Sequence, residues 1–294
     1  MISIILEVLQ IVAPVFLLAL IGFVWVRIGW AFDLQFVTRL AMTLSIPCLI
    51  FMALMRADIE PAALEALVLA TLVAYAGVAL FILVFVLIFR LERRTYLSPL
   101  IFGNTGNIGL PVALFAYGQE GLALAVLVFA IMAILSFTIG IWMVSGSVNP
   151  ITALKEPTVL ATFLGGLFML QGWRLPGWTE NTLDLIGQLG IPLMLITLGV
   201  AIARLRPGDF GKGVLLSIIK VGICVSVPWG AALYFGLDQM VLGVLVLQVA
   251  MPVAVTSYML AEKYNAKSGD VASLVVNSTL LAVFAIPAIL ISVI

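Results

Sequence analysis

The sequence lacks histidine, has only two cysteines and carries few charges, and each shortage excludes a class of protein. Charged residues make up 10% of the 294 residues, against about 25% in soluble globular domains. Cys48 and Cys224 stand singly in apolar stretches, so no zinc, haem or disulfide pattern is present. We therefore expect no metal, no cofactor and no enzymatic function. No basic stripe with interleaved aromatic residues indicates a nucleic-acid partner.

Apolar residues, in contrast, make up 64% of the chain and give a mean hydropathy of +1.28. A transmembrane helix needs about 20 predominantly apolar residues. The sequence predicts an all-α membrane protein with ten transmembrane helices, the sixth of them short, at 5–26, 36–55, 66–89, 97–117, 121–144, 158–171, 183–203, 213–235, 239–261 and 271–293.

Lysine and arginine are distributed unevenly between the two sides of the predicted helices. With the N-terminus outside, eleven of the 14 lie in cytoplasmic loops and helix ends, and only Arg56 and Arg174 lie on the outer side. Basic loops stay in the cytoplasm. We therefore expect a multi-pass protein of the cell membrane, the inner membrane in a bacterium, with both termini on the non-cytoplasmic side.

The two halves of the chain resemble each other. Leu44-Ser45-Ile46-Pro47 is echoed by Leu189-Gly190-Ile191-Pro192, and the next Gly/Ala-x-Pro segment follows at a similar distance, 64 residues from Pro47 to Pro111 and 60 from Pro192 to Pro252. Because each half would contain five helices, an odd number, the second repeat would enter the membrane from the opposite side. We predict one membrane domain over 1–294 that contains two inverted five-helix repeats, at 1–144 and 158–294, joined by a linker at 145–157.

Two predicted helices are interrupted at corresponding places. Gly103-Asn104-Thr105-Gly106-Asn107-Ile108-Gly109-Leu110-Pro111 sets glycines, asparagines and a proline inside the fourth, and Ala250–Ser257 interrupts the ninth. Broken backbone at membrane depth is tolerated only where protein buries it or where it lines a cavity. Paired discontinuous helices are typical of a transporter's substrate site, so we expect helices 4 and 9 to cross at the midplane.

The same segments carry a resemblance to a known family. FGNTGNIGLPVALFAYG at 102–118 is similar without gaps to the broken fourth helix of the auxin efflux carrier family, which includes the plant PIN-FORMED carriers. AMPVAVTSYMLAEKYN at 250–265 resembles their ninth helix. Gly103 replaces a proline of the plant carriers, Asn107 an aliphatic residue and Val253 a glutamine, and their long central loop is missing.

This resemblance implies two sub-domains and an elevator-type mechanism. Helices 1, 2, 6 and 7 would form a scaffold, which in the plant carriers also makes a homodimer. Helices 3–5 and 8–10 would form a transport domain that binds an organic carboxylate at the crossing. Because this sequence differs from the plant carriers at Gly103, Asn107 and Val253, the resemblance does not imply that auxin is the substrate.

The chemistry of the crossing also follows from its residues. A restarting helix presents unpaired N–H groups at the positive end of its dipole, which suits an anion. Asn104 and Asn107 add amide groups that either contact the ligand or tie the broken backbone together. The substrate-binding candidates here are Gly103, Asn104, Thr105, Asn107, Pro111, Pro252, Thr256 and Ser257.

Three further polar residues lie within predicted helices. Lys220 is either a cation that attracts the substrate or changes its protonation during transport, or a side chain that extends to the interface. Gln248 and Asn277, with Ser278 and Thr279 next to Asn277, either face the crossing or bond a neighbouring helix.

The function that we expect is secondary active or facilitative transport of small organic anions, and a membrane-embedded anion sensor that does not transport is the alternative. The coupling ion, the direction of transport and the particular carboxylate stay open.

Overall fold

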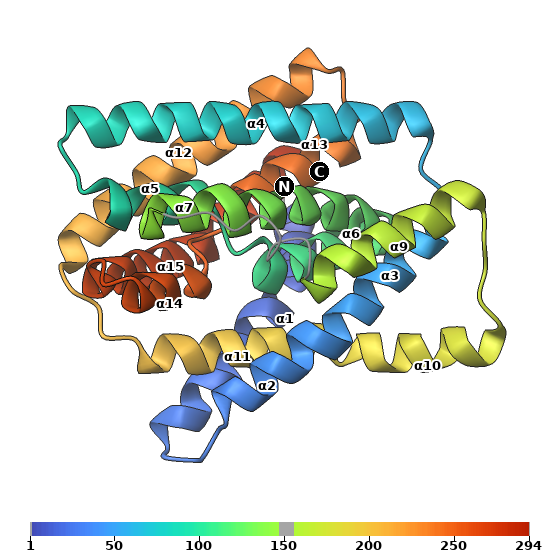
Figure 1. Cartoon of the computed structure of the whole chain (residues 1–294), viewed down its shortest axis with the longest axis horizontal. Coiled ribbons are helices and arrows are strands. Elements are labelled where there is room, and N and C mark those ends of the chain that lie inside the picture. Colours follow the sequence, from blue (N-terminus) through green and yellow to red (C-terminus); the bar gives the residue numbers. More distant parts are fainter. Residues whose placement is uncertain (1, 147–155, 294) are drawn as a thin grey trace.

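A computed structural model describes residues 2–146 and 156–293, and the regular elements in these ranges are all helices (Figure 1). Most of the predicted linker at 145–157 lies outside the described residues. The elements are α1 Ile2–Arg27, α2 Leu34–Leu40, η1 Ala41–Ser45, α3 Ile46–Arg56, α4 Pro61–Ile88, α5 Arg93–Ile101, η2 Thr105–Gly109, α6 Leu110–Leu135, η3 Ser136–Gly140, α7 Ile141–Ser145, α9 Pro157–Gln171, α10 Gly177–Gln188, α11 Gly190–Arg204, α12 Phe210–Tyr234, α13 Gln239–Val249, α14 Val255–Lys263 and α15 Ser268–Val293.

Most of these helices are apolar on every side, as expected of helices packed between protein and lipid. Exposed side chains of α4 include Leu69, Leu72, Leu80 and Phe81. Seven helical runs among the described residues are long and apolar enough to cross a membrane, and α9 and α13 are shorter apolar helices. The all-helical, multi-pass class is therefore confirmed, whereas the count of ten transmembrane helices stays a prediction.

The longest apolar run, Thr105–Ser145, contains a reversal of the chain. Gly118 has a φ of 66° and a non-helical ψ, a conformation that favours glycine. A Cβ on Gly121 would lie 2.9 Å from the carbonyl oxygen of Ala113, and a Cβ on Gly106 would lie 3.1 Å from the ring of Phe129. In one straight helix, the two residues of each pair would lie far apart along the helix axis. The segments before and after Gly118 therefore run antiparallel.

The helices pack in two groups. In the first, α1 lies against α11, and α3 lies against α9 and α10. In the second, α12 lies against α4, α13 and α15, and α5 lies against α4 and α7. Figure 1 shows α10 and α11 end to end across the lower part of the view and α4 across the upper part.

Close helix approach in the first group depends on small residues. A Cβ on Gly199 of α11 would lie 1.7 Å from the carbonyl oxygen of Ala19, and a Cβ on Gly22 of α1 would lie 2.0 Å from that of Ile196. Small residues allow this contact between membrane helices.

The proline motifs of the two halves also meet in the first group. A π-helical turn, η1, ends immediately before Ile46-Pro47, and Leu189 separates α10 from α11 just before Gly190-Ile191-Pro192. A Cβ on Gly190 would lie 2.8 Å from Cδ1 of Ile46. The two breaks are therefore in contact.

Candidate functional site

The two interrupted helices cross through backbone contacts. Gly103 and Val253 form an isolated antiparallel bridge, and the N–H of Asn104 donates a 2.6 Å hydrogen bond to the carbonyl of Pro252. A Cβ on Gly103 would lie 2.6 Å from the carbonyl oxygen of Met251. Only glycine permits this approach without movement of the backbone, so Gly103 allows the two halves to meet.

Local sequence explains how each helix breaks and restarts. The side-chain oxygen of Asn104 accepts a 3.3 Å hydrogen bond from the N–H of Asn107 and caps the turn η2. This π-helical turn ends just before Leu110-Pro111, where proline has no N–H for the usual helical bond. Wide turns of this kind occur frequently at functional sites.

Backbone donors at both restarts have no partner. Among the described residues, the N–H groups of Thr105 and Gly106 in η2, and of Val255 and Thr256 in α14, donate no hydrogen bond. The first N–H groups of any helix lack intrahelical acceptors. Here they lie at the crossing, where a bound anion can accept from them.

Several side-chain groups at the crossing are also unpartnered. Asn104 is 5% exposed and its Nδ2 has no acceptor; Thr105 and Gln248 are fully buried, and neither the threonine hydroxyl nor either atom of the glutamine amide has a hydrogen-bond partner. Gln248 lies against η2, because a Cβ on Gly109 would be 2.4 Å from its Oε1. Buried polar groups without partners are rare in native structures, so this cluster is the candidate site for a polar ligand.

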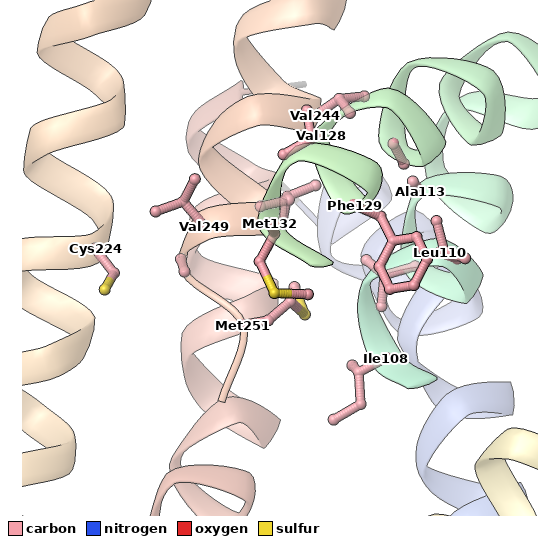
Figure 2. Packing of buried hydrophobic residues seen from close by; sticks show 14 of the residues in the cluster. Ile108, Leu110, Ala113, Val128, Phe129, Met132, Cys224, Val244, Val249 and Met251 are labelled. Carbon is pink, nitrogen blue, oxygen red and sulfur yellow. The ribbon is translucent and has the colours of Figure 1, made fainter. Parts of the chain in front are cut away.

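Apolar side chains from both halves pack against the backbone of the crossing. Figure 2 shows Ile108, Phe129, Val249 and Met251 in one buried cluster, with Met251 on the irregular segment between α13 and α14. From the other helix group, a methyl carbon of Met194 in α11 lies 3.5 Å from the position of a Cβ on Gly106. The first restart therefore contacts α11, the proline-containing helix of the other group.

The remaining candidates of the crossing differ in exposure. Pro111 and Pro252 are buried, Ser257 is 7% exposed, Asn107 is partly exposed and Thr256 is exposed. The second restart is therefore more open than the first.

Asn277 and its neighbour Ser278 make different contacts. Nδ2 of Asn277 donates to the carbonyl of Phe210 at 3.3 Å and to Oγ of Ser273 at 3.2 Å, which joins α15 to the start of α12. Oγ of Ser278 accepts a 2.9 Å hydrogen bond from the N–H of Val253 at the crossing. Of the neighbouring polar residues Asn277, Ser278 and Thr279, the one whose side chain reaches the crossing backbone is Ser278.

Lys220 is completely buried in α12, and its Nζ lies 3.1 Å from the carbonyl oxygen of Leu100. The side chain therefore bonds the end of α5 and does not extend to the interface. Sequence reasoning missed this partner, because a backbone carbonyl leaves no signal in the choice of residue.

Comparison with known proteins finds membrane transporters. The membrane transport protein family matches the chain twice, over residues 7–153 and 144–290. An uncharacterized transporter of Methanothermobacter thermautotrophicus is 26% identical over 94% of this chain and 95% of its own length. An uncharacterized transporter of Methanocaldococcus jannaschii is 27% identical over 56% of this chain and 57% of its own length. A probable auxin efflux carrier component 9 of Oryza sativa is 31% identical over 38% of this chain and 28% of its own length.

The double match shows that the chain contains two repeats, as the spacing of the proline motifs predicts. Membership of a transporter family implies a small-molecule substrate and a membrane location, which the apolar helices support. The chain belongs to the membrane transport protein family, the auxin efflux carrier family that its two interrupted helices resemble.

Proposed function

We propose that this chain transports small organic anions, either auxin-like monocarboxylates or dicarboxylates, by secondary active or facilitative transport. The observation that carries the proposal is the pair of helix restarts with free N–H groups beside the unpartnered amide of Asn104. Two helix N-termini supply a partial positive charge without a formal one. A carboxylate has acceptor positions for several of these donors at once.

The polar groups at the crossing are mainly donors. Thr105 and Gly106 offer N–H groups from one half, Val255 and Thr256 offer them from the other, and Asn104 adds its amide. The Gln248 amide can donate to a bound carboxylate, and Asn107, Ser257 and the hydroxyls of Thr105 and Thr256 complete the proposed site. A neutral guest would leave the positive helix ends uncompensated, so an anion is favoured over a neutral solute.

An elevator-type movement fits the way the helices pack. The group that contains α1, α3, α9, α10 and α11 corresponds to the proposed scaffold, which we also assign to the homodimer interface. The group that contains α4–α7 and α12–α15 corresponds to the proposed transport domain of the ten-helix arrangement. Backbone pairing of Gly103 and Asn104 with Val253 and Pro252 would let both halves of the site move as one body.

A binding screen followed by a transport assay tests the proposal. The purified protein would be heated with a panel of carboxylates that includes benzoate, indole-3-acetate, malate and succinate, and each compound that raises the melting temperature would be used for counterflow in liposomes. Saturable binding with counterflow is the expected result. Binding without counterflow would instead favour an anion sensor, and no binding by any carboxylate would contradict the assigned substrate class.

A further inference from the structure

One helix of the first group carries a buried hydroxyl that its own backbone does not satisfy. Within a helix, a serine or threonine hydroxyl can donate to the carbonyl four residues earlier. Hydroxyls that do so in this chain are those of Thr43, Thr71, Thr138, Thr162, Thr182, Ser217, Ser226 and Thr279. Thr197 in α11 is 8% exposed, and its Oγ1 has no hydrogen-bond partner. Its hydroxyl therefore does not use the carbonyl of Leu193, which its helix offers.

Among the serines and threonines that the structure describes, two more are buried with no partner for the hydroxyl, Ser45 and Thr105. Thr105 lies at the first restart. Ser45 lies where the two proline motifs meet, because its Cβ is 3.7 Å from the position of a Cβ on Gly190. Thr197 differs from Ser45 in its surroundings, since α11 packs against both η2 and α14, the two restarts of the crossing.

Thr197 lies on the face of α11 that is directed toward the second group. It follows Met194 by three positions, and residues at this spacing share one face of a helix. The methyl carbon of Met194 lies 3.5 Å from the position of a Cβ on Gly106 in η2. The close contacts of α11 with α1 are made at Ile196 and Gly199, on another face. The free hydroxyl of Thr197 is therefore on the side of α11 that meets the crossing.

A hydroxyl that is buried without a partner is unfavourable, and a ligand that accepts a hydrogen bond from it would remove this cost. An ionised carboxylate only accepts hydrogen bonds and has about four acceptor positions. We propose that the hydroxyl of Thr197 donates to the bound carboxylate and is the contribution of the first helix group to the substrate site. This inference rests on the proposed transport of carboxylates and extends the site from one helix group to both.

The contact would exist in one half of the transport cycle only. In the proposed elevator movement, the second group shifts along the first and carries the restarts away from Thr197. Thr197 stands five positions after Pro192, and the equivalent position after Pro47 is Met52. A thioether donates no hydrogen bond. The carboxylate would therefore bind more tightly when the site is open to one side of the membrane than when it is open to the other.

Substitutions at Thr197 test the contact on the full chain. Thr197→Val removes the hydroxyl and keeps the branched shape, and Thr197→Ser keeps the hydroxyl. Thr162→Val is the matched control, because Thr162 lies in α9 of the same group and its hydroxyl donates to the carbonyl of Thr158 at 2.8 Å. Each protein would be assayed in right-side-out and in inverted membrane vesicles with benzoate, indole-3-acetate, malate and succinate, and would also be melted in detergent without ligand.

We expect Thr197→Val to raise the KM of transport about 10- to 100-fold, the range for a lost hydrogen bond to a charged group, in one type of vesicle and to leave it unchanged in the other. Thr197→Ser and Thr162→Val should keep the wild-type KM in both. Without ligand, Thr197→Val should melt at the wild-type temperature or above it, because the hydroxyl that is removed has no partner to lose.

Four results would contradict the contact. Three concern KM: a wild-type value for Thr197→Val in both types of vesicle, an equal rise in both types, or an equal rise for Thr197→Ser. The fourth is a lower melting temperature of ligand-free Thr197→Val, which would show that the hydroxyl already has a partner within the protein. Any of these in a chain that moves carboxylates contradicts the role of Thr197 alone. A wild type that neither binds nor moves a carboxylate contradicts the proposed function, and the role of Thr197 with it.

Discussion

The amide of Gln248 lies directly over the backbone of Gly109, so close that a Cβ on this glycine would be 2.4 Å from Oε1 and 2.9 Å from Nε2. Neither amide atom has a hydrogen-bond partner although the side chain is fully buried. The contact joins the end of one interrupted helix to the restart of the other. A polar ligand that enters the crossing would supply partners for these two atoms.

Asn104→Asp separates the two roles of this side chain. Aspartate keeps the oxygen that caps Asn107 and loses the unpartnered Nδ2 donor. We expect carboxylate binding to weaken by about 1–3 kcal/mol or more, because a donor to a charged group is lost and a like charge is added. Binding is measured by thermal shift. Asn104→Ala is the companion variant, and its unliganded protein should also lose about 1 kcal/mol of stability with the cap. Wild-type binding by Asn104→Asp would show that Nδ2 does not contact the ligand and that the side chain acts only through its capping oxygen.

Asn107→Val should have a milder effect. Only the backbone N–H of Asn107 takes part in the observed cap, and valine retains it. We expect binding to persist and the order of preference among the carboxylates of the panel to change, because one polar side chain leaves the partly exposed rim of the crossing. Complete loss of binding would give Asn107 a larger role than its geometry suggests.

Gly103→Ala tests the approach of the two halves. The new Cβ would lie 2.6 Å from the carbonyl oxygen of Met251, so the bridge to Val253 must open. We expect a loss of about 1–3 kcal/mol of stability, measured as melting temperature in detergent, together with weaker carboxylate binding. Gly222→Ala is the control, because nothing lies within 4 Å of its Cβ position in α12. Equal behaviour of the two variants would contradict the tight crossing.

Gly199→Val should disrupt the contact between α1 and α11. Its Cβ would lie 1.7 Å from the carbonyl oxygen of Ala19, and neighbouring backbone cannot yield as a flexible side chain would. We expect most of the protein to aggregate, as measured by size-exclusion chromatography in detergent. Gly166→Ala in α9, which has open space around its Cβ position, should elute as the wild type does. A monodisperse Gly199→Val protein would be inconsistent with this helix contact.

A reporter fused after Ile294 tests the predicted orientation. The excess of lysine and arginine in alternate loops predicts that both termini face away from the cytoplasm. An enzyme that is active only outside the cytoplasm should therefore be active in this fusion. A reporter inserted between Glu92 and Arg93 is the opposite control, because that loop is predicted to be cytoplasmic. Cytoplasmic activity of the C-terminal fusion would remove the inverted five-plus-five arrangement.

The sequence by itself determined the membrane class, the two repeats and the places where the helices break. These features are local or compositional: apolar length sets the class, and proline and glycine interrupt a helix wherever they occur. The segment around Gly103 and the one around Pro252 are therefore legible without a structure.

Only the tertiary structure decided which groups meet. Nothing in the composition of α12 indicates that Lys220 contacts the carbonyl of Leu100, 120 residues earlier in the chain, or that Gln248 lacks a partner while Asn277 bonds Phe210. Helices that are apolar on all sides carry no periodic signal for the direction in which a side chain points. Their facing surfaces are set by close contacts such as Gly199 with Ala19, which exist only after the helices pack.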